Sequence, residues 1–253
     1  MATRSTCAQV LIAIRQDLFT CFWSGKKAHA NVYVNDCDED ISLSWFLIKN
    51  YKLIENALNH AITKLVSIED LLDATAGAYP FPIDLADLQK IGWVFEPYRR
   101  FRLNGGLDRK NENEYLDIVE KVGKRIAAYV KNKGKKVSLD TRYKKITGGK
   151  DWMMVEELGT DARTGLYRDG IHAYVGVRKV SDEKWIYTVG RMSSCIPFDM
   201  QKIITALNEK EKNPTDKWGG SNTIGGSPRI NGSKLLPDVV ARTIEAVLQN
   251  KDH

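Results

Sequence analysis

The sequence predicts an α/β protein built from two domains, and three observations carry this prediction. The first half joins short apolar runs to a long segment with helical apolar spacing. The second half combines strand-like runs with amphipathic helices. Between the halves, residues 131–151 are polar, basic and glycine-containing, as is typical of a connection between domains. We expect an N-terminal domain at residues 1–135, a linker at residues 136–152 and a C-terminal domain at residues 153–253.

The first half is expected to begin with strands and to continue with helices. Residues 8–14 and 32–35 are predicted to be short strands because they are apolar and partly β-branched. Apolar residues then recur at helical spacing over residues 41–66, and Asn50 or Asn59 is expected to break this helical segment.

Loops and one long helix complete the first half. Residues 76–85 contain two prolines, and residues 99–108 contain a Gly-Gly pair, so both are predicted loops. Residues 111–134 form a strongly amphipathic pattern with acids at its start and basic residues at its end, as the helix dipole favours.

The second half is expected to hold a small sheet with helices beside it. The turn "SDEK" joins two strand-like runs and therefore predicts a hairpin. The predicted strands are residues 152–158, 171–180 and 185–193, and the predicted helices are residues 197–212 and 237–250.

Composition excludes several classes of protein. No apolar run is long enough to cross a bilayer, and the N-terminus lacks the features of an export signal, so we expect a cytoplasmic protein without membrane contact. The four cysteines form no CxxC pair, which argues against a zinc ribbon or a redox motif. The net charge of +6 suits a polyanionic ligand, although a soluble protein can also be basic for no functional reason.

Three acids crowd the stretch "VYVNDCDED", where Asp36, Asp38 and Asp40 occupy alternate positions. Carboxylates this close repel one another unless they are protonated or bound to a cation, and Mg²⁺ or Mn²⁺ prefers such oxygen ligands. An EF-hand loop is excluded, because Ile41 and Leu47 stand where it needs glycine and glutamate. The alternative is a solvated acidic turn in which Asp40 caps the following helix.

A glycine-rich stretch near the C-terminus, "IGGSPRING", contains Gly225, Gly226, Ser227 and Arg229. Glycines allow backbone N–H groups to approach an anion, and an arginine can pair with it through two hydrogen bonds. The residue order is neither that of a Walker A loop nor that of a dinucleotide fingerprint. The alternative is a flexible surface loop.

Taken together, these stretches resemble the DHH phosphoesterase superfamily, which contains RecJ-like exonucleases, oligoribonucleases and exopolyphosphatases. "VYVNDCDEDISLSWFL" is similar to the D-x-D-x-D strand of that family, and "GGSPRING" is similar to its glycine loop, with Ser227 where the family usually has histidine. "YTVGRMSS" resembles the strand whose arginine contacts substrate, which points to Arg191. The resemblance implies an N-terminal parallel-sheet α/β domain that binds metal, a smaller C-terminal α/β domain that binds substrate, and an active site in the cleft between them.

The chain departs from this family in one important respect, because it has no Asp-His-His motif. In "IEDLLDATAG", Asp73 would hold the aspartate position while Ala74 and Thr75 replace the histidines, and Asp70 is a competing candidate. Asp108 is a candidate for the last aspartate of the family. The metal ligands implied by the resemblance are Asp36, Asp38, Asp40 and Asp73.

The resemblance implies a metal-dependent phosphoesterase with Mn²⁺ or Mg²⁺ as its cofactor. Its substrate would be a small phosphorylated ligand or a short single-stranded nucleic acid, and a homodimer is compatible with its size. Loss of the histidine pair leaves the alternative of a degenerate relative that binds a nucleotide or polyanion without cleaving it. The positive net charge alone leaves a further alternative, an architectural nucleic-acid protein. The expected catalytic residues are Asp38, Asp40 and Asp73, and the expected substrate-binding residues are Arg191, Gly225, Gly226, Ser227 and Arg229.

Overall fold

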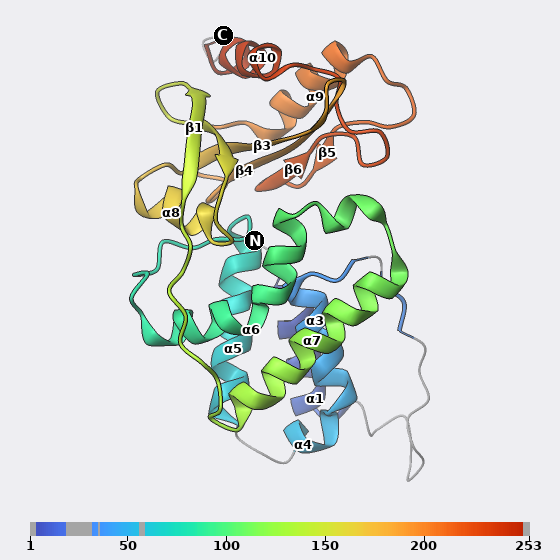
Figure 1. The fold of residues 1–253 in the computed structure, drawn as a ribbon, viewed down its shortest axis with the longest axis vertical. Helices are drawn as coiled ribbons and strands as arrows, with labels where there is room; N and C mark the ends of the chain where they lie inside the picture. Colours follow the sequence, from blue (N-terminus) through green and yellow to red (C-terminus); the bar gives the residue numbers. More distant parts are fainter. Residues whose placement is uncertain (1–3, 19–31, 35, 56–58, 250–253) are drawn as a thin grey trace. The chain divides into compact units, whose positions relative to one another are not determined.

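The α/β class is confirmed by the structure, a computed structural model whose chain divides into two compact units (Figure 1). The described residues are 4–18, 32–34, 36–55 and 59–249. The first unit comprises Met1–Ala74 and Phe81–Leu139, and the second comprises Thr75–Pro80 and Asp140–His253. The expected linker at residues 136–152 contains the passage from the first unit to the second, and it also contains strand β1 (Tyr143–Gly148).

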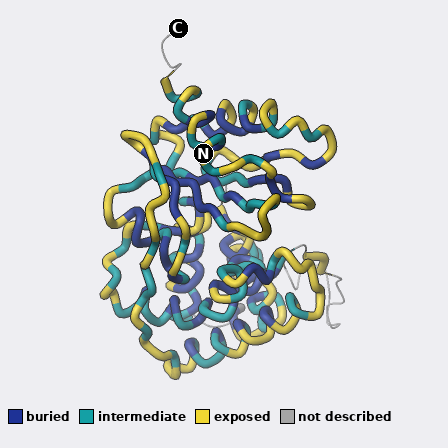
Figure 2. Tube along the Cα trace, turned by 45° about the horizontal axis from the view of Figure 1, so that its top comes forward, coloured by how far each residue is buried: buried dark blue, intermediate teal, exposed yellow. Residues whose placement is uncertain are grey.

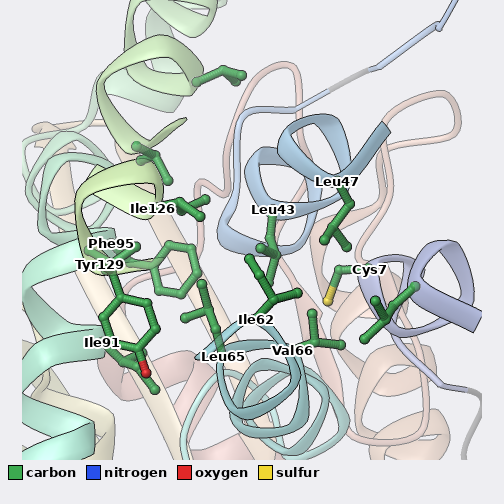
Figure 3. Close-up of a cluster of buried hydrophobic side chains, with 14 of the residues drawn as sticks. Cys7, Leu43, Leu47, Ile62, Leu65, Val66, Ile91, Phe95, Ile126 and Tyr129 are labelled. Atoms are coloured by element: carbon green, nitrogen blue, oxygen red, sulfur yellow. The ribbon is translucent and has the colours of Figure 1, made fainter. Parts of the chain in front are cut away.

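All regular elements among the described residues of the first unit are helices. Its elements are α1 (Thr6–Arg15), α3 (Glu39–Lys49), α4 (Tyr51–Glu55), α5 (His60–Ala74), α6 (Ala86–Leu103), the short 3-10 helix η1 (Gly106–Arg109) and α7 (Glu112–Val130). Apolar side chains from α3, α5, α6 and α7 meet in one core, where Leu43, Leu65, Phe95 and Ile126 are fully buried (Figure 3).

The strand predicted at residues 8–14 is wrong, because α1 occupies this segment. The buried residues of α1 are Cys7, Ala8, Leu11 and Ile14, which share one face of a helix. A short apolar run fits either a buried strand or a buried helix, and here the helical face decides. Since residues 32–34 are also outside any strand, the expected N-terminal parallel sheet is absent from the described part of this unit.

Three further predictions for the first unit can be compared with the structure. The predicted break at Asn50 is confirmed, since Asn50 caps the end of α3, and α7 begins as expected with the side chain of Asn111 accepting from two N–H groups. The loop predicted at residues 99–108 is wrong in its first half, because α6 continues to Leu103. The helix ends before Gly105, whose φ of 70° lies in the left-handed region that favours glycine.

The second unit is built on a six-stranded sheet with the order β1-β2-β3-β4-β6-β5. The pair β2–β3 is parallel, and the other neighbouring pairs are antiparallel. The predicted hairpin is confirmed as β3–β4. Apart from β1, the strands of the sheet are β2 (Met153–Glu157), β3 (Ala173–Ser181), β4 (Lys184–Arg191), β5 (Gly219–Gly220) and β6 (Ile224–Gly226).

Alternation along the strands gives this sheet two apolar faces. Met154 and Val175 pack in one core with α9 (Met200–Glu211) and α10 (Pro237–Gln249), both predicted, which cover one face (Figure 1). Val155 and Tyr174 point to the other face and pack with Leu166 of α8 (Ala162–Arg168).

Burial follows this layered arrangement (Figure 2). The first five residues of β3, from Ala173 to Val177, are all buried, whereas the last three are exposed. None of the helices in the described part of the chain is long and apolar enough to cross a membrane.

Candidate functional site

The acidic stretch lies where the chain enters α3. Asp38 is the N-cap of this helix, and its Oδ1 accepts from the N–H of Ile41 at 2.8 Å. Asp36 Oδ1 accepts from the N–H of Cys37 at 2.6 Å. Capping satisfies an N–H group that the first turn of a helix leaves without a partner, so part of this acidic pattern builds α3.

Asp40 differs from Asp38, because it caps α1 rather than α3, the helix to which it belongs. Its two carboxylate oxygens accept from the backbone N–H groups of Thr6 at 2.9 Å and Cys7 at 2.7 Å. Asp70 of α5 supports the same helix end, since its Oδ1 accepts from the N–H of Ser5 at 2.7 Å and from its hydroxyl at 2.9 Å. Two carboxylates from distant helices therefore hold the positive end of the α1 dipole.

A buried ion pair connects this acidic stretch to α6. Arg99 of α6 donates through Nε to Glu39 Oε1 at 2.7 Å and through Nη2 to Oε2 at 3.0 Å. Glu69 of α5 is 4% exposed, and its Oε2 has no hydrogen-bond partner within the described residues. Sequence reasoning missed all three residues, because nothing in their local pattern indicates that they meet.

The carboxyl groups of α3 and α5 act on one another electrostatically. Burial raises the pKa of Asp38 to about 7, and the charges of Asp36, Asp40 and Glu39 add to the rise. Burial likewise raises the pKa of Glu69 well above its usual range, with Glu39 as the next cause. We call this group of carboxyls the acid cluster; its members are Asp36, Asp38, Glu39, Asp40, Glu69, Asp70 and Asp73.

Asp73 joins the acid cluster from the end of α5. Although the residue is exposed overall, partial burial of its carboxyl group raises its pKa, and the charges of Asp40 and Asp70 raise it further. Asp40 is thus the common neighbour of the cluster, since its charge acts on Asp38, Glu69 and Asp73. Asp108 lies in η1, and its charge acts together with that of Asp36 on the hydroxyl of Tyr115.

The acid cluster has the chemistry of a cation site, but its side chains are not gathered around one point. Among the residues that the structure places, no three His, Cys, Asp or Glu side chains form a group that could hold a metal ion. Two observations nevertheless fit a hard divalent cation: the buried Oε2 of Glu69 that lacks a partner, and carboxylates whose negative charges oppose ionisation of Asp38 and Asp73.

The glycines of the second candidate region lie in the sheet rather than in a loop. Gly225 and Gly226 belong to β6, which pairs with β4 on one side and β5 on the other. A Cβ atom on Gly225 would lie 2.8 Å from the carbonyl oxygen of Gly219, so close strand packing accounts for this glycine. With strands on both sides, the backbone of β6 has no open edge to offer an anion.

Nearly all backbone N–H groups of the loop after β6 donate hydrogen bonds within the protein. Ser227 is buried, and it exchanges hydrogen bonds with the backbone of Tyr187 through its N–H and its hydroxyl, both at 3.0 Å. Asp216 Oδ2 accepts from the N–H groups of Ile230 at 3.0 Å and Asn231 at 2.7 Å. Anion recognition by this loop would therefore rest on side chains.

Glu211, the last residue of α9, fastens the end of the same loop. Its carboxylate accepts from the indole of Trp218 at 3.0 Å, the hydroxyl of Ser233 at 2.5 Å and the N–H of Lys234 at 2.9 Å. At the tip of this anchored loop, Arg229 is exposed and makes no hydrogen bond or ion pair with any described residue. Arg229 is therefore an exposed guanidinium on a loop that is anchored at both sides.

Arg191 sits at the end of β4 and is mostly occupied by the protein itself. Its Nε donates to the carbonyl of Asn222 at 2.6 Å, and its Nη1 donates to the carbonyls of Ser194 at 3.3 Å and Ile196 at 3.0 Å. This geometry ties two loops to the strand. A substrate contact by Arg191 is left to its Nη2 group.

Comparison of this chain with protein-family models, with curated proteins and with solved structures finds no match.

Proposed function

We propose that this protein is a metal-dependent phosphoesterase that hydrolyses a phosphate ester of a nucleotide, a short oligonucleotide or a related phosphorylated ligand. The observation that carries the proposal is the acid cluster, in which Asp40 acts on three other carboxyls while Glu69 presents a buried oxygen without a partner. Mn²⁺ or Mg²⁺ would relieve this repulsion with the oxygen ligands that it prefers.

We assign the roles within the acid cluster from the contacts that its carboxyls already make. Asp36, Asp38 and Asp73 would hold the cation, and their side chains would have to turn toward one point to do so. Asp40 would contribute charge more than coordination, since each of its oxygens already accepts an N–H from α1. A bound cation would supply a metal-activated water as nucleophile and would stabilise negative charge on the phosphoryl oxygens.

The second unit would supply recognition of the phosphorylated ligand. Arg229 is the better candidate for an anion contact, since its guanidinium is exposed on an anchored loop, whereas most donors of Arg191 are engaged. Gly225, Gly226 and Ser227 would act indirectly, by fixing β6 and the start of the loop.

The test is hydrolysis of bis(p-nitrophenyl) phosphate, p-nitrophenyl phosphate and a 5′-phosphorylated dinucleotide with Mn²⁺ present. We expect the wild type to cleave at least the diester substrates and Asp38→Asn to lose this activity. Arg229→Met is expected to raise KM for the dinucleotide and to leave the small synthetic diester unaffected. Lys217→Met, another exposed cation, is the matched control. Equal turnover by wild type and Asp38→Asn would refute the proposal.

A second candidate function is a binding protein that holds a nucleotide or polyanion without cleaving it. The observation in its favour is that Asp40 and Asp70 serve as caps of α1, which leaves fewer carboxylates for a metal. Equilibrium dialysis of a radiolabelled nucleotide in EDTA separates the two functions. Binding without metal that Arg229→Met abolishes, together with no hydrolysis of any substrate, favours the binding protein.

A further inference from the structure

A short segment between two helices of the first unit belongs to the second unit. The segment is Thr75–Pro80, which we call the strap; α5 precedes it and α6 follows it in the chain. Asp73 of the acid cluster lies two residues before the strap begins. Anything that fixes the strap therefore acts on the chain directly next to this carboxylate.

Three side chains of the second unit hold the strap by its carbonyl groups. The hydroxyl of Tyr167 donates to the carbonyl of Thr75 at 3.1 Å. The hydroxyl of Tyr174 donates to the carbonyl of Ala76 at 3.2 Å, and Nη1 of Arg163 reaches the same oxygen at 3.5 Å. These donors come from α8 and β3, so the strap is fastened to both a helix and the sheet.

Packing and backbone shape hold the strap as firmly as its hydrogen bonds. Ala76 and Ala78 are fully buried, and Ala78 is part of a core with Val155 and Leu166. Ala76 (φ 62°) and Gly77 (φ 82°) are consecutive residues in the left-handed region, which an alanine adopts only when its surroundings enforce it. The second unit thus fixes the strap in one conformation.

The three side chains that hold the strap also contact one another or the sheet. Arg163 pairs with Glu157 of β2 at 3.0 Å, and both side chains are nearly buried. The guanidinium of Arg163 also lies over the ring of Tyr174, 5.5 Å from its centroid. Tyr167 and Tyr174 pack edge to face with their centroids 6.1 Å apart. Breaking one of these contacts should loosen the others, because they share partners.

We propose that Arg163, Tyr167 and Tyr174 are positioning residues that fix Asp73 through the strap. The role of Asp73 in this proposal rests on the proposed function, whereas the coupling of the strap to the end of α5 does not. The end of α5 is then held in place by residues more than 80 positions later in the chain.

The test compares the full-length wild type with Tyr167→Phe/Tyr174→Phe, which removes both hydroxyl donors and keeps both rings. Tyr143→Phe is the matched control, because its hydroxyl donates to Asp169 at 2.9 Å in the same unit and not to the strap. We expect the double variant to exchange amide hydrogens faster in the strap and also in residues 71–74, and to bind Mn²⁺ about tenfold more weakly. The control should match the wild type in both measurements.

Gly77→Ala provides a second variant that leaves the tyrosines intact. Its Cβ would lie 3.2 Å from Nη1 of Arg163, at a backbone conformation that alanine resists, so it should reproduce both effects. Faster exchange confined to the strap, with residues 71–74 and Mn²⁺ affinity unchanged, would overturn the proposal. If the wild type binds no Mn²⁺, the proposed function fails while exchange in residues 71–74 still decides whether the strap is coupled to α5.

Discussion

Asp38 should control how the stability of the protein responds to pH. Its folded pKa of about 7 lies above the value of about 3.9 expected in an unfolded chain. The folded state therefore keeps the proton more tightly between these values. The stability gained from protonated Asp38 is complete below about pH 4 and is lost as the pH rises through 7.

Asp38→Asn should remove this loss, because asparagine is neutral and remains a good N-cap. In metal-free buffer at pH 8 we expect the variant to be more stable than the wild type by about 1–2 kcal/mol, and near pH 4 we expect no difference. Urea unfolding between pH 4 and 8 measures this. Asp84→Asn, in an exposed turn, is the control. A variant less stable than the wild type at pH 8 would contradict the pKa of Asp38.

The sequence indicated the acidic residues but not the hydrogen bonds that each of them makes. "DCDED" drew attention to Asp36, Asp38 and Asp40 as a group. The role of Asp40 as a cap depends on α1, whose Thr6 lies 34 positions away, and Asp70 reaches Ser5 across 65 positions. Such contacts follow from the tertiary fold, so no local pattern could reveal them.

Among the helices, the pair Arg99–Glu39 should be a main connection between α3 and α6. Removing Arg99 leaves Glu39 as a nearly buried carboxylate beside Glu69, so Arg99→Met should destabilise the protein by about 3–5 kcal/mol. Arg100→Met is the matched control, because Arg100 pairs with Glu96 on the surface and should cost less than about 1 kcal/mol. Urea denaturation of both variants measures the difference, and equal effects would argue against the buried pair.

The loop after β6 should depend on Glu211. Glu211→Ala leaves the indole of Trp218, the hydroxyl of Ser233 and the N–H of Lys234 without their acceptor. We expect the free energy of unfolding to fall by about 2–3 kcal/mol and amide exchange across residues 230–234 to become faster. Glu209→Ala, an exposed position on the same helix, should change neither quantity. Unchanged exchange in Glu211→Ala would show that the loop is anchored by other contacts.

Elements with clear periodicity could be predicted from the sequence, and ambiguous ones could not. The hairpin β3–β4 and the helices α7, α9 and α10 match their patterns. The apolar run at residues 8–14 is too short to distinguish a strand from a helix, and the helical burial of Cys7 and Leu11 depends on neighbours that the pattern does not name. The helix α6 was not predicted, and its last residues were assigned to the loop before Gly105; the pairing of Arg99 with Glu39, which lies 60 positions away, is a tertiary contact that no local pattern shows.

At the scale of the whole molecule, the passage of the chain between its two units is more complex than its composition indicates. The basic stretch before β1 predicts one connection, and the chain does pass to the second unit between Leu139 and Asp140. The chain also enters the second unit earlier, at the strap, although the sequence of this segment indicates only a proline-containing loop. Its partners Arg163, Tyr167 and Tyr174 lie far along the sequence, so the insertion follows from tertiary packing.

Cation binding by the acid cluster can be measured directly by calorimetric titration of Mn²⁺ into the wild type and into Asp38→Asn/Asp73→Asn. This pair is chosen because neither residue caps α1, so loss of binding would not reflect loss of that helix. Asp117→Asn/Asp182→Asn, which removes two exposed acids elsewhere, is the control. We expect micromolar binding by the wild type and the control, and none by Asp38→Asn/Asp73→Asn. Absence of binding by the wild type, or unchanged binding by Asp38→Asn/Asp73→Asn, would contradict the acid cluster as a cation site.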